Sequence, residues 1–561
     1  MLPDIAAVDR SFDYLVPPEL LGQLQVGTMV RVALHGRRVG GWVVELADEP
    51  ETDRPLQPVA KVRGWGPPAD VVDLARWAAW RWAGPTTTFL GTASPPTAVR
   101  SLPRPGAGPS APPAAELLFR ANGAVVRVPP AGDTLRLALA AARRPDALVL
   151  TPSLDDVSRL AAELRARGHA VATYPADWAR AAAGGCTVVG ARAAAWAPRP
   201  NLGAVLVLDE HDEGWQEERT PTWNARDVAV ERARRARAPW VLTSPCPSLE
   251  ALAMGPLATL SRAEERAGWP VVEVADRRRE APGLGLYSER LVTLVRDLPR
   301  VVCVLNRKGR ARLLACTNCG ELVRCERCGA AVQELEPGVL RCQRCGAERP
   351  LVCGACGATK LKVIRAGVSR VRDELERLAG KPVGEVTGDS APGEALAAPV
   401  VVGTEAVLHR AGRADAVIFL DFDQELLAPR YRAAEEALAL LARAARVVGG
   451  RSRGGRILVQ TRMPGHETIE AAVHADPSLF AVVESARRAA LRFPPEAALA
   501  LVSGAAADDF VEALGSEVEV MGPADGRWLV RAPDHGALCD ALAAAPRPAG
   551  RFRVAVDPLR A

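Results

Sequence analysis

The densest chemical signal in this chain is a run of paired cysteines. Eight of the twelve cysteines form four Cys-x-x-Cys doublets, namely Cys316/Cys319, Cys325/Cys328, Cys342/Cys345 and Cys353/Cys356. Two thiolates at this spacing can bind one tetrahedral Zn²⁺, so four doublets predict two Cys₄ sites. No ligand position is left open for a substrate, so the two Zn²⁺ ions are expected to be structural. Glycines at or beside the thiols permit positive φ and close approach of main-chain amides: Gly320, Gly329, Gly346, Gly354 and Gly357.

The other four cysteines, Cys186, Cys246, Cys303 and Cys539, are scattered singly, and no secretory signal peptide is predicted. This distribution argues against disulfide bonds and favours a reducing, cytoplasmic setting. Spacing alone leaves all three ways of pairing the doublets open. One of them joins the two inner doublets across a hairpin, which would bring the outer doublets together.

Length and composition set only wide limits. At 561 residues the chain is too long for one core, and three to five domains are expected. The formal net charge of +5 and the pI near 8.6 are mildly basic and identify no partner. No run of about 18 apolar residues lacks charges and prolines, which argues against a membrane span.

Residues 1–98 are expected to form a small β-rich domain. Apolar runs at Val30–Val32 and Val39–Leu46 flank the basic turn His35–Arg38, a pattern typical of a β-hairpin. Leu74–Trp82 is expected to be helical, with its tryptophans in the local core. Residues 99–116 are rich in Pro, Gly and Ala and are interpreted as a linker.

Residues 117–285 alternate between strand and helix patterns, which predicts a first α/β lobe. The apolar strand Ala204–Leu208 runs directly into Asp209-Glu210-His211-Asp212. Acidic residues at the C-terminal ends of parallel strands lie where such sheets bind ligands.

Residues 286–464 predict a second α/β lobe, which the cysteine segment interrupts as an insertion at 310–362. The tail, 465–561, is expected to be a small α+β domain. The predicted fold class is therefore α/β multidomain, with two parallel-sheet lobes and smaller domains at both ends.

Asp-Glu-His after an apolar strand has the form of a Walker B carboxylate pair. In such a pair one carboxylate binds Mg²⁺ and the other activates the attacking water. With a sheet on either side, the chain resembles the two lobes of superfamily-2 helicases. Over nearly its whole length it resembles the PriA family of primosomal replication-restart proteins. Besides the cysteines, this resemblance rests on Val8–Pro17, Gly27–Val32, Thr222–Val230, Thr243–Glu250, Leu305–Gly309, Val402–Glu405 and Val459–His466.

The resemblance implies a pocket for DNA 3′ ends, with Phe12 and Tyr14 as walls for the terminal base and Asp13 accepting from the 3′-hydroxyl. The alternative is that both aromatics are core residues of a small barrel. The resemblance also favours nested zinc sites: Cys316, Cys319, Cys353 and Cys356 on one metal, and Cys325, Cys328, Cys342 and Cys345 on the other. The implied partners are forked and single-stranded DNA, other primosome proteins, and the replicative helicase or its loader. Single-stranded-DNA-binding protein is a further candidate partner.

The chain departs from the family at its nucleotide site. A Walker A loop reads Gly-x-x-x-x-Gly-Lys-[Ser/Thr], so that amides and a lysine hold the phosphates. The corresponding segment here is Val128–Thr134, where two prolines remove amide donors and Asp133 replaces the lysine. ATP and Mg²⁺ are therefore not expected to bind, and no residue is assigned a catalytic role. The degenerate site comprises Gly132, Asp133, Thr134, Asp209 and Glu210, and the arginine-finger motif is eroded to 449–453.

Three functions are compatible with these features. The favoured one is a replication-restart protein that binds abandoned or stalled forks and promotes reloading of the replicative helicase, without its own helicase activity. An active ATP-dependent 3′-to-5′ DNA helicase is the first alternative, against which the missing lysine argues. A zinc-ribbon adaptor that binds only protein is the second, against which the N-terminal resemblance argues.

Overall fold

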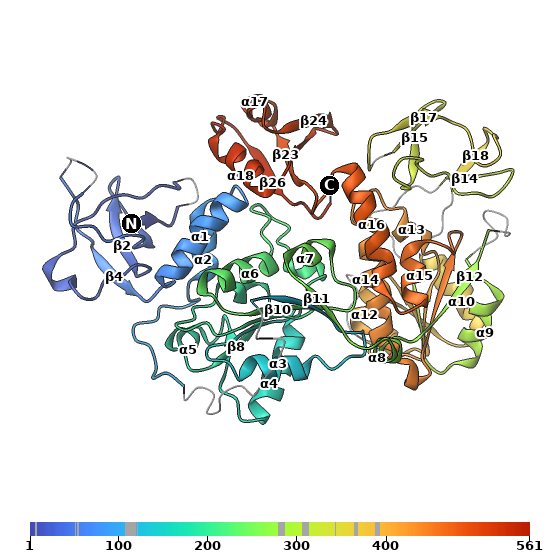
Figure 1. The fold of residues 1–561 in the computed structure, drawn as a ribbon, viewed down its shortest axis with the longest axis horizontal. Helices are drawn as coiled ribbons and strands as arrows, with labels where there is room; N and C mark the ends of the chain where they lie inside the picture. The colour runs from blue at the N-terminus through green and yellow to red at the C-terminus, as the bar shows by residue number, and fades with distance from the viewer. Residues whose placement is uncertain are drawn as a thin grey trace.

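The chain is organised around two parallel sheets, with smaller domains attached to both (Figure 1). The computed structural model describes residues 1–561 except 6–7, 51, 53–54, 107–118, 120–121, 279–285, 306–313, 343, 364–367, 387–392 and 561. In this described part of the chain, no helix has the length and apolarity needed to cross a membrane. The expected linker and the motif at 305–309 lie largely outside the described residues.

The N-terminal domain is an antiparallel sheet followed by two helices. The strand order is β1-β3-β2-β4. The predicted hairpin is confirmed, and it turns at His35 and Gly36, whose φ values of 49° and 76° suit a two-residue turn. The elements are β1 (Leu2–Pro3), η1 (Pro18–Leu20), β2 (Met29–Leu34), β3 (Arg37–Trp42), β4 (Lys61–Gly64), α1 (Ala69–Arg81) and α2 (Thr86–Ala93).

Aromatic rings join these two helices to the first lobe. Trp82 is fully buried, and its ring centroid lies 6.4 Å from that of Phe89 in α2. Phe89 in turn lies 5.4 Å from Trp196 of the first lobe. Trp77 of α1 and Trp82, which follows it, therefore pack in a core shared with the first lobe, and not in a purely local core. Trp80 lies outside this core, and its indole donates to Asp540 near the end of the chain at 2.8 Å.

The first lobe is a seven-stranded parallel sheet in the order β11-β5-β10-β9-β6-β8-β7. Its strands are short and, except for the exposed edge strand β11, almost entirely buried, as expected for a sheet covered by crossover helices. The strands are β5 (Ala124–Arg127), β6 (Leu148–Leu150), β7 (Val171–Tyr174), β8 (Thr187–Gly190), β9 (Val205–Val207), β10 (Trp240–Ser244) and β11 (Leu257–Thr259). The helices are α3 (Leu135–Ala142), α4 (Leu154–Ala166), α5 (Trp178–Ala183), η3 (Arg192–Trp196), η4 (Glu213–Trp215), α6 (Ala225–Ala236), α7 (Leu249–Met254) and α8 (Arg262–Gly268).

The second lobe is a six-stranded parallel sheet in the order β12-β22-β21-β13-β20-β19. Its strands are β12 (Val271–Asp276), β13 (Val301–Val304), β19 (Val383–Val386), β20 (Val400–Gly403), β21 (Ala416–Phe419) and β22 (Arg456–Thr461). Its helices are α9 (Glu289–Asp297), α10 (Val368–Ala379), α11 (Glu394–Ala397), α12 (Ala406–Arg410), α13 (Asp423–Leu426), α14 (Ala433–Val448), η5 (Arg451–Arg453), α15 (Glu467–Val473) and α16 (Pro477–Leu491).

The cysteine segment emerges between β13 and α10 of the second lobe, as predicted, and we call residues 314–363 the cysteine module. It contains two small antiparallel sheets and lies beside α13 (Figure 1). The strands are β14 (Leu314–Cys316), β15 (Val332–Glu336), β16 (Val339–Cys342), β17 (Glu348–Pro350) and β18 (Leu361–Val363).

The chain ends in a four-stranded antiparallel sheet with the order β24-β25-β23-β26. Its helix α18 packs against α1 of the N-terminal domain, so the two terminal domains are in contact, although the chain ends themselves lie apart (Figure 1). The elements are β23 (Ala498–Gly504), α17 (Ala507–Glu512), β24 (Glu519–Ala524), β25 (Arg527–Ala532), α18 (His535–Ala544) and β26 (Phe552–Val556).

The predicted fold class is confirmed, but two segments belong to other bodies than expected. We placed residues up to 285 in the first lobe, whereas β12 pairs in parallel with β22 of the second. We placed everything after 464 in the C-terminal domain, whereas Ile469 and Phe480 are buried in the core of the second lobe. A strand or helix pattern specifies the element and its apolar face, but not which neighbour covers that face.

Candidate functional site

The segment corresponding to the phosphate loop directs its amides into the protein. Pro129 and Pro130 have no amide to offer, and the amide of Ala131 donates to the carbonyl of Gly268 at 3.1 Å. The amide of Gly132 donates to the carbonyl of Pro129 at 2.7 Å. A phosphate cradle needs several converging, unoccupied amides, and these positions do not provide them.

Asp133 stands where a Walker A loop would have its lysine, and its carboxylate is bonded locally. Its carboxylate accepts from the amide of Leu135 at 3.0 Å and pairs with Arg136 at 3.2 Å. Thr134 only precedes α3, and its side chain makes no capping hydrogen bond. Asp133 therefore places a negative charge at the start of α3, where a nucleotide phosphate would otherwise be attracted.

The acidic motif lies at the same sheet edge, because β5, β10 and β9 are parallel neighbours. The carboxylate of Asp209 is held by both terminal nitrogens of Arg446, with Nη1 donating to Oδ2 at 2.6 Å. Burial alone would raise the pKa of Asp209, but the Arg446 guanidinium keeps it below its usual value. Both carboxylate oxygens of Asp209 are engaged in this bidentate pair, so a Mg²⁺ ion at this position would have to displace the Arg446 guanidinium.

Glu210 is also fully engaged. It is 2% exposed and accepts from the amide of Ser248 at 2.8 Å, from its hydroxyl at 2.7 Å and from Arg226 at 3.1 Å. Burial raises the pKa of Glu210, and Arg226 opposes this shift. Asp209 and Glu210 thus both take part in ion pairs with arginines of the same protein.

Sequence reasoning missed the arginines that engage this motif. Arg446 and Arg443 both come from α14 of the second lobe, and Arg443 pairs with Asp212 at 2.8 Å. In the segment where we sought the eroded arginine finger, Arg451 and Arg453 lie exposed on η5. The spacing of arginines along α14 was the only available signal, and it does not reveal the partner.

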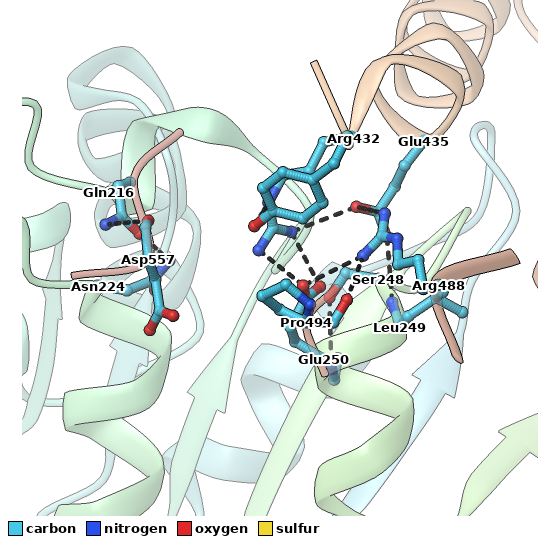
Figure 2. A network of polar contacts seen from close by, with 12 residues as sticks. Gln216, Asn224, Ser248, Leu249, Glu250, Arg432, Glu435, Arg488, Pro494 and Asp557 are labelled. Carbon is cyan, nitrogen blue, oxygen red and sulfur yellow. Dashed lines mark hydrogen bonds and ion pairs between the residues drawn. The ribbon is translucent and has the colours of Figure 1, made fainter. Parts of the chain in front are cut away.

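A second group of ion pairs connects the lobes behind the acidic motif. Figure 2 shows Arg432 and Arg488 of the second lobe directed toward Glu250 of the first. Glu250 lies 2.7 Å from Arg432 Nη2 and 3.2 Å from Arg488 Nη1. Glu435 of the second lobe pairs with Arg488 at 2.9 Å within that lobe. It also accepts a hydrogen bond from the amide of Leu249 in the first lobe at 3.0 Å. We call Glu250, Arg432, Glu435 and Arg488 the interlobe network.

A cavity of about 580 Å³ opens where both lobes meet the C-terminal domain. Carboxylates from several elements line it, among them Glu210, Asp212 and Glu436, together with Arg226 and Arg443. Burial raises the pKa of Glu436 to about 7. None of residues 128–134 lines this cavity, so its walls are not those of a phosphate-loop nucleotide site.

The cysteine module brings the eight thiols into two tetrads. Cys316, Cys319, Cys353 and Cys356 form one group and Cys325, Cys328, Cys342 and Cys345 the other, in the nested arrangement expected. The Sγ atoms of Cys328 and Cys342 lie 3.5 Å apart, and those of Cys319 and Cys353 lie 3.7 Å apart. Four Zn–S bonds of about 2.3 Å place tetrahedral sulfurs roughly 3.8 Å apart, so both donor sets fit zinc.

The same backbone turn occurs at all four doublets. After each second cysteine comes a glycine with φ between 72° and 74°, whose amide donates to the carbonyl of the first cysteine of its doublet. These glycines are Gly320, Gly329, Gly346 and Gly357, and Gly354 has no such role. A positive φ at this place is what turns both thiolates toward a common point.

Phe12, Asp13 and Tyr14 lie together along the edge of the N-terminal sheet. The amide of Phe12 donates to the carbonyl of Met1 at 2.9 Å, and the terminal amine of Met1 donates back at 2.7 Å. The guanidinium of Arg10 lies 4.8 Å from the centre of the Phe12 ring. The hydroxyl of Tyr14 donates to the carbonyl of Ala33 at 2.9 Å. All three side chains are half-buried, which leaves part of each accessible to a ligand.

The comparisons with known proteins converge on one family. Residues 2–95 match the family of the PriA 3′ DNA-binding domain (3′BD). Over 94% of its length the chain is 30% identical to a probable replication restart protein PriA from Mycobacterium leprae, 91% of which is covered. It is 30% identical to a protein of the same name from Mycobacterium tuberculosis over 89% of this chain and 85% of that protein. The replication restart protein PriA from Bacillus subtilis is 28% identical over 56% of this chain and 43% of that protein.

Proposed function

The chain belongs to the PriA family of replication restart proteins, and on this premise we propose that it acts at replication forks without being a motor. It binds abandoned or stalled forks and promotes reloading of the replicative helicase. Its ligands are forked and single-stranded DNA. Its protein partners are other primosome proteins, the replicative helicase or its loader, and single-stranded-DNA-binding protein.

One observation carries the non-motor part of this proposal: the groups that would bind Mg²⁺ and nucleotide phosphates are already bonded within the protein. Phosphoryl transfer works by placing positive charge and amide dipoles around the β- and γ-phosphates. Here the loop amides bond to Gly268 and Pro129, and Asp133 reverses the sign of the charge. Unit charges about 4 Å apart interact by roughly 4 kcal/mol at an effective dielectric near 20, so this reversal is large.

The lobes then act as a scaffold. Arg446 and Arg443 hold the acidic motif of the first lobe against α14 of the second, and the interlobe network adds further pairs. A motor must open and close this interface in each cycle, whereas a scaffold benefits from keeping it closed. The scaffold fixes the N-terminal domain, the cysteine module and the C-terminal sheet relative to one another.

Each tetrad holds one structural Zn²⁺ in this proposal. Four thiolates satisfy the metal completely, and metal binding adds folding energy to a segment whose own apolar cluster is small. The outer tetrad ties the ends of the module together, and the inner tetrad supports the β15–β16 hairpin.

The retained carboxylates Asp209 and Glu210 favour one rival, an active ATP-dependent 3′-to-5′ helicase. The zinc-loaded full chain should bind forked and single-stranded DNA without any DNA-stimulated ATP turnover. Because the Arg443–Asp212 pair and the interlobe network remain, Asp209→Asn should leave fork binding and helicase reloading unchanged. The control Asp156→Asn, at a half-buried position of α4, should do the same. DNA-stimulated turnover that Asp209→Asn abolishes would overturn the non-motor proposal.

A further inference from the structure

One face of the N-terminal sheet carries four cations on adjacent strands. Arg31 of β2 lies opposite Lys61 of β4 and opposite Gly40 of β3. The next outward position of β2, Ala33, lies opposite Arg38. Directly paired residues of antiparallel strands share a face, so these side chains project together. With Arg63, which follows Lys61 by two positions, they form what we call the basic face: Arg31, Arg38, Lys61 and Arg63.

The opposite face of the same strands is the core. Val30 and Val32 are 0% exposed and pack with Val43 and Val59, which forces the alternating residues Arg31 and Ala33 to the other side. Toward the other end of these strands Trp42 is covered, and its indole donates to Ser94 at 2.8 Å. The uncovered part of the sheet is therefore the part that holds the cations.

The four cations have no ion-pair partner among the described residues, and all four are exposed. By contrast, the exposed residues Arg159 of α4 and Arg167, which follows α4, are paired, with Asp156 and Glu163 respectively. The rows of paired residues on the basic face contain only cations, Ala33 and Gly40. A Cβ at Gly40 would lie 3.3 Å from Nη1 of Arg63, so this guanidinium lies over the bare backbone of β3.

We propose that the basic face binds the phosphate backbone of DNA next to the 3′ end. The proposal rests on the proposed function, in which residues 12–14 hold that end. Tyr14 bonds to the carbonyl of Ala33, and Leu15 pairs with residues 57–59, which lead directly into β4 and Lys61. Because Tyr14 packs against the apolar face, a DNA strand leaving the 3′-end segment has to pass around the edge strand β4. It then meets Lys61 and Arg63 first, and Arg31 and Arg38 beyond them.

The ligand follows from the charge pattern. Strands are about 4.8 Å apart, so cations on three adjacent strands extend over roughly 10 Å, which suits successive phosphates. Small residues between the cations leave the face flat, so it offers no pocket for reading a base. The contact is therefore electrostatic and independent of sequence, and each phosphate that it neutralises releases counterions.

The test is the salt dependence of DNA binding by the full-length, zinc-loaded protein. The double variant Arg31→Gln/Lys61→Gln is compared with Arg159→Gln/Arg167→Gln, which removes the same charge from α4. Affinity for a single-stranded oligonucleotide and for a duplex is measured between 50 and 200 mM salt. The first variant should lower the slope of log K against log salt by about 1.4 on the single strand or about 1.8 on the duplex. Binding near 100 mM salt should weaken roughly tenfold or more, and the control should match the wild type.

The substrate on which the salt slope changes, single strand or duplex, is the DNA form that contacts the basic face. A slope equal to that of the control on both substrates would overturn the proposal. Asp13→Ala separates this outcome from failure of the 3′-end contact, because it should abolish the preference for free over blocked 3′ ends and leave the slope unchanged. Loss of discrimination without a change in slope supports the 3′-end contact alone, and the reverse pattern supports the basic face alone. Circular dichroism of the variants confirms that these exposed substitutions leave the fold intact.

Discussion

Asp13 is a half-buried carboxylate in the segment that we propose for the DNA 3′ end. A carboxylate is an acceptor-only group, so it suits a free 3′-hydroxyl and not a blocked one. Asp13→Ala should weaken binding of forks with a free 3′ leading-strand end by about 1.5–3 kcal/mol, the usual range for a hydrogen bond to a charged group. Fluorescence anisotropy with free and 3′-phosphorylated ends measures the difference. Equal weakening of both substrates would contradict the assignment.

Phe12 provides the matched comparison. Arg10 already covers one side of its ring at 4.8 Å, so a terminal base would have to stack on the other side. Phe12→Leu keeps an apolar side chain but removes the ring, which should cost about 1–3 kcal/mol on free ends. A loss of folding stability without any change in DNA affinity would instead mark Phe12 as a core residue.

His466 gives the chain a defined pH dependence. Its Nδ1 accepts from the amide of Thr468 at 3.2 Å and thereby caps α15. Burial lowers the pKa of His466 from its ordinary value of 6.5 to about 4, although Glu467 opposes the shift. The unfolded chain therefore binds the proton more readily than the folded one. The contribution of neutral His466 to the free energy of unfolding is complete above pH 6.5 and is lost as the pH falls toward 4.

Lowering the pH from 7.5 to 5 should reduce the free energy of unfolding by about 2 kcal/mol through His466 alone. His466→Asn keeps an acceptor for the cap but does not titrate, so it should remove that part of the pH dependence. Urea denaturation at both pH values measures the difference, with the more exposed His474→Asn as control. An unchanged pH dependence in His466→Asn would show that the neutral cap is not what acid disrupts.

At the scale of residues, sequence reasoning succeeded where chemistry is local. The spacing inside each cysteine doublet fixes two ligands at once, so the eight thiols could be named without a structure. The partners of Asp209 could not, because Arg446 follows it by 237 positions and reaches it only through the packing of two lobes. Nothing near either residue in the sequence records that contact.

At the scale of elements, the cysteine module behaves as two nested metal sites. The inner tetrad joins residues on either side of the β15–β16 hairpin, whereas the outer tetrad closes the module at its ends. Cys342→Ser should reduce the zinc content from two ions to one per chain, measured by atomic emission, because the remaining three thiolates no longer complete a tetrahedral site.

Three companion variants make this test specific. Cys316→Ser should also leave one zinc ion, and combining it with Cys342→Ser should leave none. Cys303→Ser replaces a fully buried cysteine outside both tetrads and should retain both metals. A single substitution that releases both ions would contradict independent tetrads.

Whether a segment forms a helix or a strand was largely predictable from the sequence, but the domain to which that element belongs was not. Helix α10 and strand β8 follow directly from apolar periodicity, since a buried face repeats with the period of its backbone. Strand β12 and helices α15 and α16 have equally clear patterns, yet they belong to the second lobe instead of the neighbouring domain. Assignment of an element to a domain depends on long-range packing, which a local pattern does not contain.

At the scale of the whole molecule, the two lobes are joined by charges that are withdrawn from water. Arg488 is 1% exposed and is surrounded by Glu250, Glu435 and Glu484, while the carbonyl of Pro494 accepts from its Nη1 at 3.1 Å. Buried charges are costly to leave without partners, so the position of each lobe depends on groups supplied by the other. This dependence is what distinguishes a fixed scaffold from two lobes that move separately.

Removing one carboxylate of the interlobe network should therefore loosen the whole molecule. Glu250→Gln keeps the size of the side chain but leaves Arg432 and Arg488 with less negative charge. Because Arg488 keeps Glu435 and Glu484, we expect a cost of about 2–3 kcal/mol in urea denaturation. Amide exchange should become faster in α7 and α14 together, starting with the amide of Leu249, which donates a hydrogen bond to Glu435.

The control Glu163→Gln breaks an exposed ion pair at α4 and should cost no more than about 0.5 kcal/mol in the free energy of unfolding. If Glu250→Gln matched that control in both stability and exchange, the lobes would not be held together by this network.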